Sequence, residues 1–177
     1  MDSPQEYGVP KSRIRVLKDM APSSAGDYVV YWMTATRRAH WNFALDRAVE
    51  LALSLDRPLV VFEPLRVGYR WASDRFHQFI VQGMLDNAEG FAGTNVLYFP
   101  YVEPTPGAGS GLLESLMERA SAVVADDYPA FFLPQMLEAA AAKSPVRMEA
   151  VDSNGLLPMG APGRVFHRAY DFRRYLQ

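Results

Sequence analysis

Several loops of this chain carry side chains that can bind a ligand, and the first follows an apolar run at residues 27–33. It contains Thr34, Ala35, Thr36 and Arg37. Hydroxyl groups, a guanidinium group and the free N–H groups of a helix start can together hold an anion. The same residues also fit a capped helix start whose arginine faces water, so both interpretations stay open.

Acidic residues follow three other apolar runs. Asp126 and Asp127 end one of them, Glu63 follows another and Asp152 a third. A pair of carboxylates can share a proton or take a metal ion. No further acid or histidine clusters with Asp126 and Asp127 in the sequence, which favours a helix-capping role, or a hydrogen bond to a ligand, over a metal site. Glu63 and Asp152 could orient a ligand or close a turn.

The residues of a self-sufficient catalyst are not apparent. The chain has no cysteine, and its three histidines are His40, His77 and His167. No G-x-S-x-G motif is present, so nothing indicates a nucleophilic triad. The stretch PGAGSG lacks the GK[ST] ending of a phosphate-binding loop, and we interpret it as a flexible connection.

Five apolar runs alternate with five segments of helical periodicity. The runs are apolar on both faces, which is typical of strands in a parallel sheet covered on both sides. The predicted strands are 27–33, 58–62, 95–102, 121–126 and 146–152. The predicted helices are 42–56, 73–93, 112–120, 129–143 and 166–177. This order predicts an α/β fold, a doubly wound and mostly parallel five-stranded sheet of Rossmann-like type with helices on both faces.

A sheet of this kind also predicts where a ligand binds. The binding crevice lies beyond the carboxyl ends of the strands, at the point where the strand order reverses. The loops that leave the predicted strands should therefore form the site. They are residues 34–41, 63–69, 104–111, 126–128 and 152–157.

Composition limits the class of protein. The 177 residues carry 18 Lys and Arg against 20 Asp and Glu, so the net charge is −2 and there is no overall basic field for nucleic acid. The first residues lack the apolar core of a signal peptide, and no run approaches the roughly 18 apolar residues of a membrane span. We expect a soluble cytoplasmic protein. Residues 1–26 are assigned to an N-terminal tail, 27–163 to one α/β domain and 164–177 to the start of a further helix.

Three stretches, in the same order, resemble the N-terminal domain of class II-type DNA photolyases, within the photolyase/cryptochrome family. YVVYWMTATRRAHWNFALDRAVELA resembles the opening strand, turn and helix of that domain. VVADDYPAFFLP resembles its strand-Asp-aromatic-Pro segment, and VDSNGLLP a strand-Asp-x-Asn segment near the end of the domain. FHRAYDFRRYLQ resembles the start of the connector towards the next domain.

The resemblance implies a function that the residues alone do not show. In this family the α/β domain carries a light-harvesting antenna chromophore, a deazaflavin or a folate. A second, helical domain binds FAD and acts as a light-driven lyase on pyrimidine dimers that it flips out of damaged DNA. The resemblance therefore predicts a domain or truncated relative that lacks the FAD-binding partner domain and is not catalytic by itself.

Taken together, the loops and the resemblance give a set of candidate residues. The expected cofactor-binding residues are Thr34, Ala35, Thr36, Arg37, Glu63, Asp126, Asp127 and Asn154. No metal ligand and no catalytic residue is expected. Two alternatives remain: a nucleotide-binding α/β module, since the same fold supports that function, and an interaction domain without a ligand whose C-terminal helix docks a partner.

Overall fold

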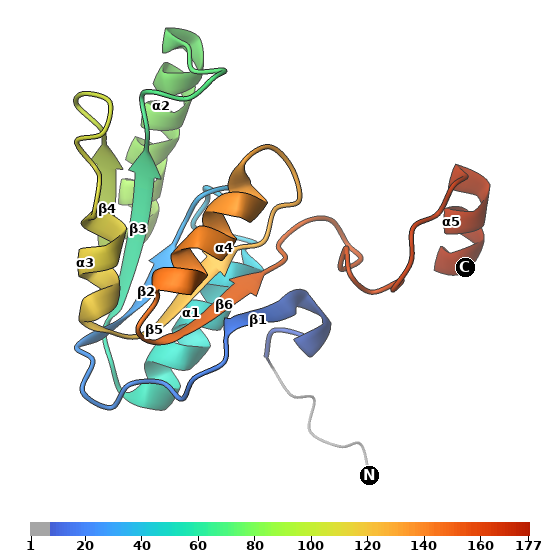
Figure 1. Cartoon of the computed structure of the whole chain (residues 1–177), viewed down its shortest axis with the longest axis horizontal. Helices are drawn as coiled ribbons and strands as arrows, with labels where there is room; N and C mark the ends of the chain where they lie inside the picture. Colours follow the sequence, from blue (N-terminus) through green and yellow to red (C-terminus); the bar gives the residue numbers. More distant parts are fainter. Residues whose placement is uncertain (1–7) are drawn as a thin grey trace.

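A six-stranded sheet forms the centre of the computed structural model, which describes residues 8–177 (Figure 1). The order across the sheet is β1-β6-β5-β2-β3-β4. β1 pairs antiparallel with β6, and the other neighbouring strands are parallel. The strands are β1 (Ile14–Lys18), β2 (Tyr28–Trp32), β3 (Leu59–Leu65), β4 (Val96–Val102), β5 (Ala120–Asp126) and β6 (Arg147–Val151).

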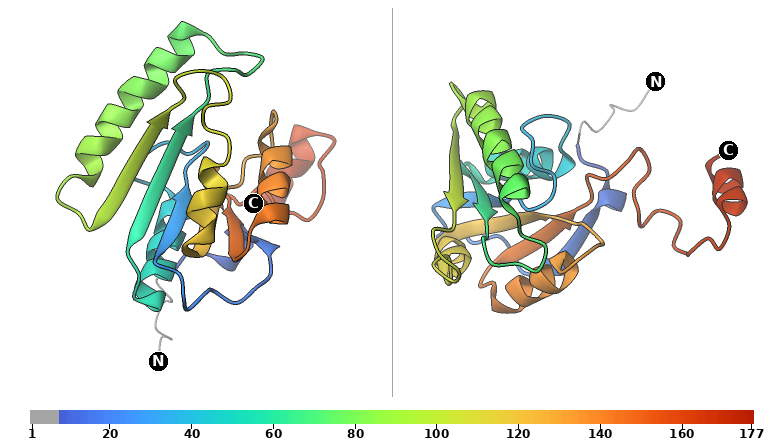
Figure 2. Two further views of the ribbon diagram at one scale, coloured as in Figure 1. Left: turned by 60° about the vertical axis from the view of Figure 1, so that its left-hand side comes forward. Right: turned by 90° about the horizontal axis from the view of Figure 1, so that it is seen from above.

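Helices cover both faces of the sheet, as the sequence predicts (Figure 2). α1 (Phe43–Leu55) and α2 (Asp74–Phe91) pack on one face, whereas α3 (Leu112–Glu118) and α4 (Leu133–Lys143) pack on the other. α5 (Ala169–Leu176) follows a long connection after β6. The α/β class, the mostly parallel sheet and the helices on both faces are confirmed.

Alternation along β2 divides the core between the two faces. Val29 and Tyr31 pack under α1, and Val30 and Trp32 pack under α3 and α4. Successive side chains of a strand point to opposite faces, so a central strand must be apolar throughout. This is why the predicted buried strands were recognisable in the sequence.

The sheet has one more strand than the five predicted. The additional strand is β1, which lies within the segment assigned to the tail. It pairs on one side only, with β6, and its central residues are exposed. A half-exposed edge strand of five residues lacks the continuous apolar character by which the others were found.

Among the boundaries that differ from the prediction, those of β3 and α4 matter most for the candidate site. β3 continues to Leu65, so Glu63 lies inside a strand and not in the loop after it. α4 begins at Leu133, four residues later than predicted, because Phe131 adopts a left-handed backbone conformation (φ 59°) before the helix. Pro134 lies in the first turn of α4, where its missing N–H costs nothing.

Side-chain caps fix the starts of the two helices on the first face. The Asn42 side chain accepts a hydrogen bond from the N–H of Leu45 at 3.1 Å, and Ser73 Oγ accepts one from Phe76 at 3.4 Å. Such caps satisfy N–H groups that lack partners within the helix. They set where the loops after β2 and β3 end.

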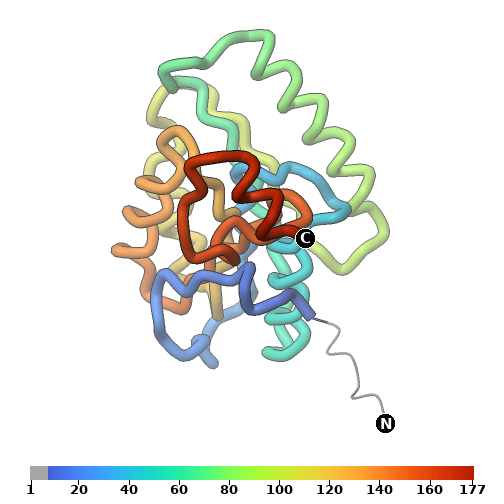
Figure 3. Tube along the Cα trace, turned by 90° about the vertical axis from the view of Figure 1, so that its right-hand side faces the viewer, coloured from blue at the N-terminus to red at the C-terminus, as the bar shows by residue number. Residues whose placement is uncertain are grey.

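The C-terminal segment stands apart from the sheet (Figure 1). In Figure 3, which is viewed from that side, it lies in front of the rest of the protein. No residue of α5 is buried. The aromatic rings of this segment contact one another instead. The ring centroid of Phe166, which precedes α5, lies 5.3 Å from that of Phe172 and 5.4 Å from that of Tyr175. Among the residues that the structure describes, no helix has the length and apolar character needed to cross a membrane.

Candidate functional site

The reversal of strand order lies between β2 and β5. From β2 the chain continues outward to β3 and β4, and from β5 it continues in the opposite direction to β6. The loops after β2 and β5 diverge at this point, and in open α/β sheets that divergence creates the ligand crevice. The predicted residues 34–37, 126 and 127 all leave the sheet here.

The crevice at this point is occupied by a carboxylate of the protein itself. Asp126 Oδ2 accepts hydrogen bonds from the backbone N–H groups of Thr34, Ala35 and Thr36 at 2.8, 2.8 and 3.0 Å. Its Oδ1 accepts a further bond from the Tyr31 hydroxyl at 2.8 Å. Burial raises the pKa of Asp126 and the hydrogen bonds oppose that effect. The prediction placed an anion at this loop with the N–H groups of a helix start, but α1 begins only at Phe43, and the backbone N–H groups of residues 34–36 are already bound to Asp126.

A second buried acid organises the neighbouring loop. Glu63 is fully buried and pairs with Arg37 at 3.1 Å, while Arg37 also donates to the Pro64 carbonyl at 2.7 Å. The other carboxylate oxygen of Glu63 accepts bonds from Asn87 at 2.9 Å and Tyr98 at 2.6 Å. Burial, with Glu63 beside it, raises the pKa of Tyr98, so that hydroxyl remains a donor. Arg37 is thereby fixed at the crevice edge.

Asp127 and Asn154 lie in a separate cluster beside β1. Asp127 forms a two-pronged ion pair with Arg15, with both N–O distances 3.0 Å. Asn154 donates to the Asp127 carbonyl and to the Asp152 carboxylate, each at 3.0 Å. These contacts join the ends of β5 and β6 to the edge strand.

The structure divides the eight predicted residues into three groups. Thr34 and Arg37 line a cavity. Ala35, Thr36, Glu63 and Asp126 support the loops behind it, and Asp127 and Asn154 belong to the β1 cluster. The last two residues do not line the cavity.

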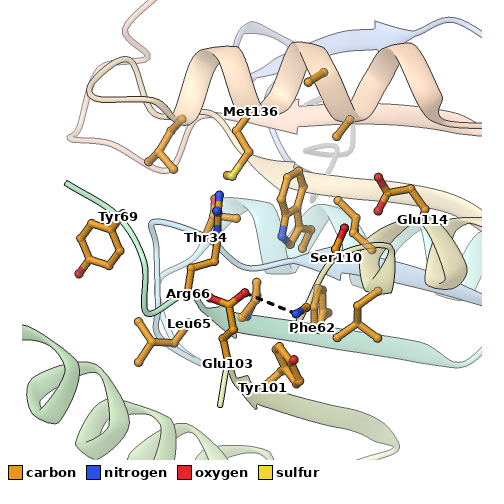
Figure 4. Close-up of a pocket in the computed structure, with 18 of the residues that line it drawn as sticks. Thr34, Phe62, Leu65, Arg66, Tyr69, Tyr101, Glu103, Ser110, Glu114 and Met136 are labelled. Carbon is orange, nitrogen blue, oxygen red and sulfur yellow. Dashed lines mark hydrogen bonds between the residues drawn. The ribbon is translucent and has the colours of Figure 1, made fainter. Parts of the chain in front are cut away.

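The cavity has a volume of about 620 Å³ and lies on the α3 and α4 face of the sheet (Figure 4). This size is in the range of small-molecule sites. Apolar side chains, both aromatic and aliphatic, make up most of its walls. Five charged side chains also line it: Arg37, Arg66, Glu103, Glu114 and Lys143. The residues that line it include Trp32, Phe62, Arg66, Tyr101, Glu103 and Met136.

Two aromatic pairs connect the loops that border the cavity. Tyr69 and Phe132 lie 6.2 Å apart between ring centroids, and Trp71 meets Phe131 edge-on at 5.5 Å. One member of each pair precedes α2 and the other precedes α4. We call these four residues the aromatic clasp. They hold the two loops together across the cavity rim.

Glu103 anchors the glycine-rich loop on the opposite wall. Its carboxylate accepts hydrogen bonds from the N–H groups of Val67 (3.0 Å), Gly107 (2.8 Å) and Gly109 (3.4 Å). Gly107 has φ 87°, a conformation that favours glycine. The stretch interpreted as a flexible connection is thus tied to the end of β3 through one buried acid.

Acidification is expected to release this loop. The bond from Val67, with those from the two glycines, lowers the pKa of Glu103 below its ordinary value of 4.5. The depressed pKa means that Glu103 stabilises the fold above pH 4.5, and that this contribution is lost as the pH falls through the folded-state pKa.

Urea unfolding of the wild type and Glu103→Gln at pH 6.5 and pH 3.5 tests this expectation. The variant should be less stable at the higher pH, and the difference should shrink at the lower one. An equal difference at both values would show that the ionised carboxylate does not hold the loop.

Glu103, Trp71, Phe131 and Phe132 lie outside the loops expected from the sequence to form the site, whereas Tyr69 lies in the predicted loop 63–69. Glu103 follows the apolar run 95–102, which is the same signal that identified Glu63 and Asp126, so it could have been found. The clasp depends on contacts between residues far apart in the chain, for which the sequence offers no periodic signal. Within residues 8–177, no group of three or more His, Asp or Glu side chains is placed to hold a metal ion.

Comparison with known proteins gives one clear similarity. No known family profile matches this chain. The chain is 31% identical over 147 residues to a deoxyribodipyrimidine photo-lyase of Methanothermobacter thermautotrophicus strain Delta H. The alignment covers 83% of this chain but 32% of that protein, so the chain spans about a third of the length of the relative it matches.

A solved universal stress protein in complex with cAMP aligns with 73% of this chain and 100% of its own, at 16% identity and a TM-score of 0.41. A match this distant carries no functional information.

Proposed function

We propose that this chain is the chromophore-binding α/β domain of a photolyase-like protein of the class II type, and that it binds a deazaflavin or folate antenna without being catalytic by itself. The observation that carries the proposal is the aromatic cavity of about 620 Å³ beside the strand-order reversal. The 31% identity to a photolyase over 83% of the chain supports it. The cavity provides a site, and the similarity suggests its occupant.

The walls of the cavity fit a planar conjugated ring. Trp32, Phe62 and Tyr101 present aromatic surfaces, and offset stacking between such surfaces and a ring system is favourable beyond simple burial. Phe62 itself packs against Phe99, with ring centroids 5.4 Å apart and the ring planes tilted by 33°, which fixes its orientation. A rigid ring held among fixed aromatic walls keeps a defined direction, and an antenna needs this to transfer excitation energy.

The polar groups at the rim suit an anionic substituent on the ring. Arg66 is exposed and forms no ion pair with the described residues, whereas Arg37 is paired with Glu63. An unpaired guanidinium can make a bidentate contact with phosphate or carboxylate. We therefore place the charged tail of the chromophore near Arg66 and the ring deeper, between β2 and α4.

The remaining parts of the photolyase activity are not proposed for this α/β domain. We assign FAD binding, the light-driven lyase reaction and contact with damaged DNA to a second, helical domain of the kind that the resemblance to photolyases implies. Residues 164–177 are proposed to begin the connector towards it. This proposal is supported by α5, an eight-residue helix that has no buried residue and in which Tyr170 and Phe172 are exposed.

A ligand titration tests the proposal. The chain is titrated with a deazaflavin, methenyltetrahydrofolate and flavin mononucleotide (FMN), and with AMP and ATP as representatives of the nucleotide-binding alternative. Polarisation of chromophore fluorescence and calorimetry report binding. We expect saturable binding of at least one chromophore at one site per chain. Binding of AMP or ATP alone would favour the nucleotide module, and no binding at millimolar ligand would contradict the antenna proposal.

A further inference from the structure

Trp32 is the one tryptophan among the described residues that lines the cavity. It is the last residue of β2, its side chain belongs to the core under α3 and α4, and the residue is 5% exposed. Its Nε1 is buried and has no hydrogen-bond acceptor among residues 8–177. An indole N–H is a donor only, and a buried donor left without an acceptor is destabilising because its lost hydrogen bond to water is not replaced.

The charged groups of the same cavity, apart from the exposed Arg66, are by contrast paired within the protein. Glu103 accepts from loop amides, Arg37 is held by Glu63, and Lys143 pairs with Glu114 at 2.8 Å. The indole N–H therefore differs from these paired groups as a buried donor that has no partner among the described residues. A few well-placed polar groups in an apolar pocket commonly determine which ligand binds and in which orientation.

We infer that Trp32 is the specificity-determining residue of this cavity, and that the ligand accepts a hydrogen bond from Trp32 Nε1 through a carbonyl oxygen or ring nitrogen on its edge. The inference rests on the proposed function and deepens it. The ligand belongs to the class of planar heteroaromatic rings with an acceptor in the ring plane. A site that pairs a buried donor rejects analogues that lack the acceptor much more strongly than a purely apolar pocket does.

Indole N–H signals observed by ¹⁵N NMR provide a direct readout. The chain has three tryptophans, so three indole signals are expected. Trp41 and Trp71 are 91% and 50% exposed, and the exposed-site variants Trp41→Phe and Trp71→Phe assign their signals, leaving that of Trp32. Adding FMN, whose ring bears two carbonyl acceptors, should move the Trp32 proton signal downfield, whereas the Trp41 signal should stay in place.

The variant Trp32→Phe supplies the matching affinity measurement. It keeps an aromatic ring but removes the N–H donor together with the pyrrole part of the indole, so FMN should bind at least about tenfold more weakly than to the wild type. Trp41→Phe, made at an exposed position outside the cavity, should bind FMN as the wild type does.

The outcomes separate this inference from the proposed function. FMN binding with a moved Trp32 signal supports both. FMN binding with an unmoved Trp32 signal overturns the role of Trp32 and leaves the cavity as a chromophore site. Absence of FMN binding overturns the inference, and absence of binding by deazaflavin and folate as well overturns the proposed function. The NMR spectrum of the wild type tests the role of Trp32 even if the variant Trp32→Phe fails to fold.

Discussion

Replacing Glu63 by alanine is expected to lower the free energy of unfolding by about 3–5 kcal/mol, the usual cost of removing one partner from a buried ion pair. Glu63 is fully buried and joins three side chains from different elements: Arg37 after β2, Asn87 on α2 and Tyr98 on β4. Without the carboxylate, the buried Asn87 amide loses its acceptor and the Arg37 charge loses its counter-ion.

Thermal or urea unfolding measures this loss, and the melting temperature should fall by roughly 10 °C for a chain of this size. Glu138→Ala is the matched control. Glu138 is also paired with an arginine, at 3.0 Å from Arg15, but its side chain is 65% exposed. Exposed pairs contribute only about 0–1 kcal/mol. Equal destabilisation by the two substitutions would show that the Glu63 network does not hold these elements together.

Replacing Ala139 by phenylalanine is expected to weaken chromophore binding by at least about tenfold, with little change in stability. Ala139 lies on α4, lines the cavity and is exposed to solvent. A phenyl ring at this position projects into the space proposed for the chromophore, and close-packed sites accommodate added volume poorly. Because the position is exposed, the substitution leaves the core unchanged.

Ala142→Phe provides the control from the same helix. Ala142 is also exposed but does not line the cavity. It should bind the chromophore as the wild type does, and its melting temperature should match that of Ala139→Phe. Weakened binding in both variants would indicate a general effect on α4, and unchanged binding in both would locate the chromophore elsewhere.

The fold was predictable because the sheet is buried on both faces. The runs that became β2 and β5 are apolar throughout, and the segments between them have helical periodicity, so class and element order follow from hydrophobic pattern alone. β1 escaped this reasoning because it is an edge strand whose stability comes from pairing with β6 and from Arg15, which binds Asp127.

The site was predictable only as a region. The sequence placed Thr34 and Arg37 at the carboxyl edge of the sheet, and both line the cavity. The sequence did not reveal that the Asp126 carboxylate accepts hydrogen bonds from the backbone N–H groups of residues 34–36, because these contacts join positions about ninety residues apart. Nor did it reveal the cavity, whose walls come from α3, α4 and the loops after β3 and β4.

Placement by the sheet also explains why the polar loop after β2 is mainly structural. Its backbone is held from behind by Asp126, and Arg37 is held from the side by Glu63. A loop fixed in this way presents a rigid wall, and preorganised sites lose less entropy on binding than mobile ones. Most of the polar contacts of this loop thus support the cavity from behind, and mainly apolar side chains, with several aromatic ones among them, form its surface.

The proposal that the cavity holds an antenna chromophore is tested most directly by purifying the chain from a host that makes deazaflavin. Absorbance between the near ultraviolet and the blue should accompany the wild type and Ala142→Phe at close to one chromophore per chain, and should be absent from Ala139→Phe. Equal absorbance in Ala139→Phe would place the chromophore outside the cavity. No absorbance in any of the three, with no uptake of added deazaflavin or folate, would contradict the proposed function.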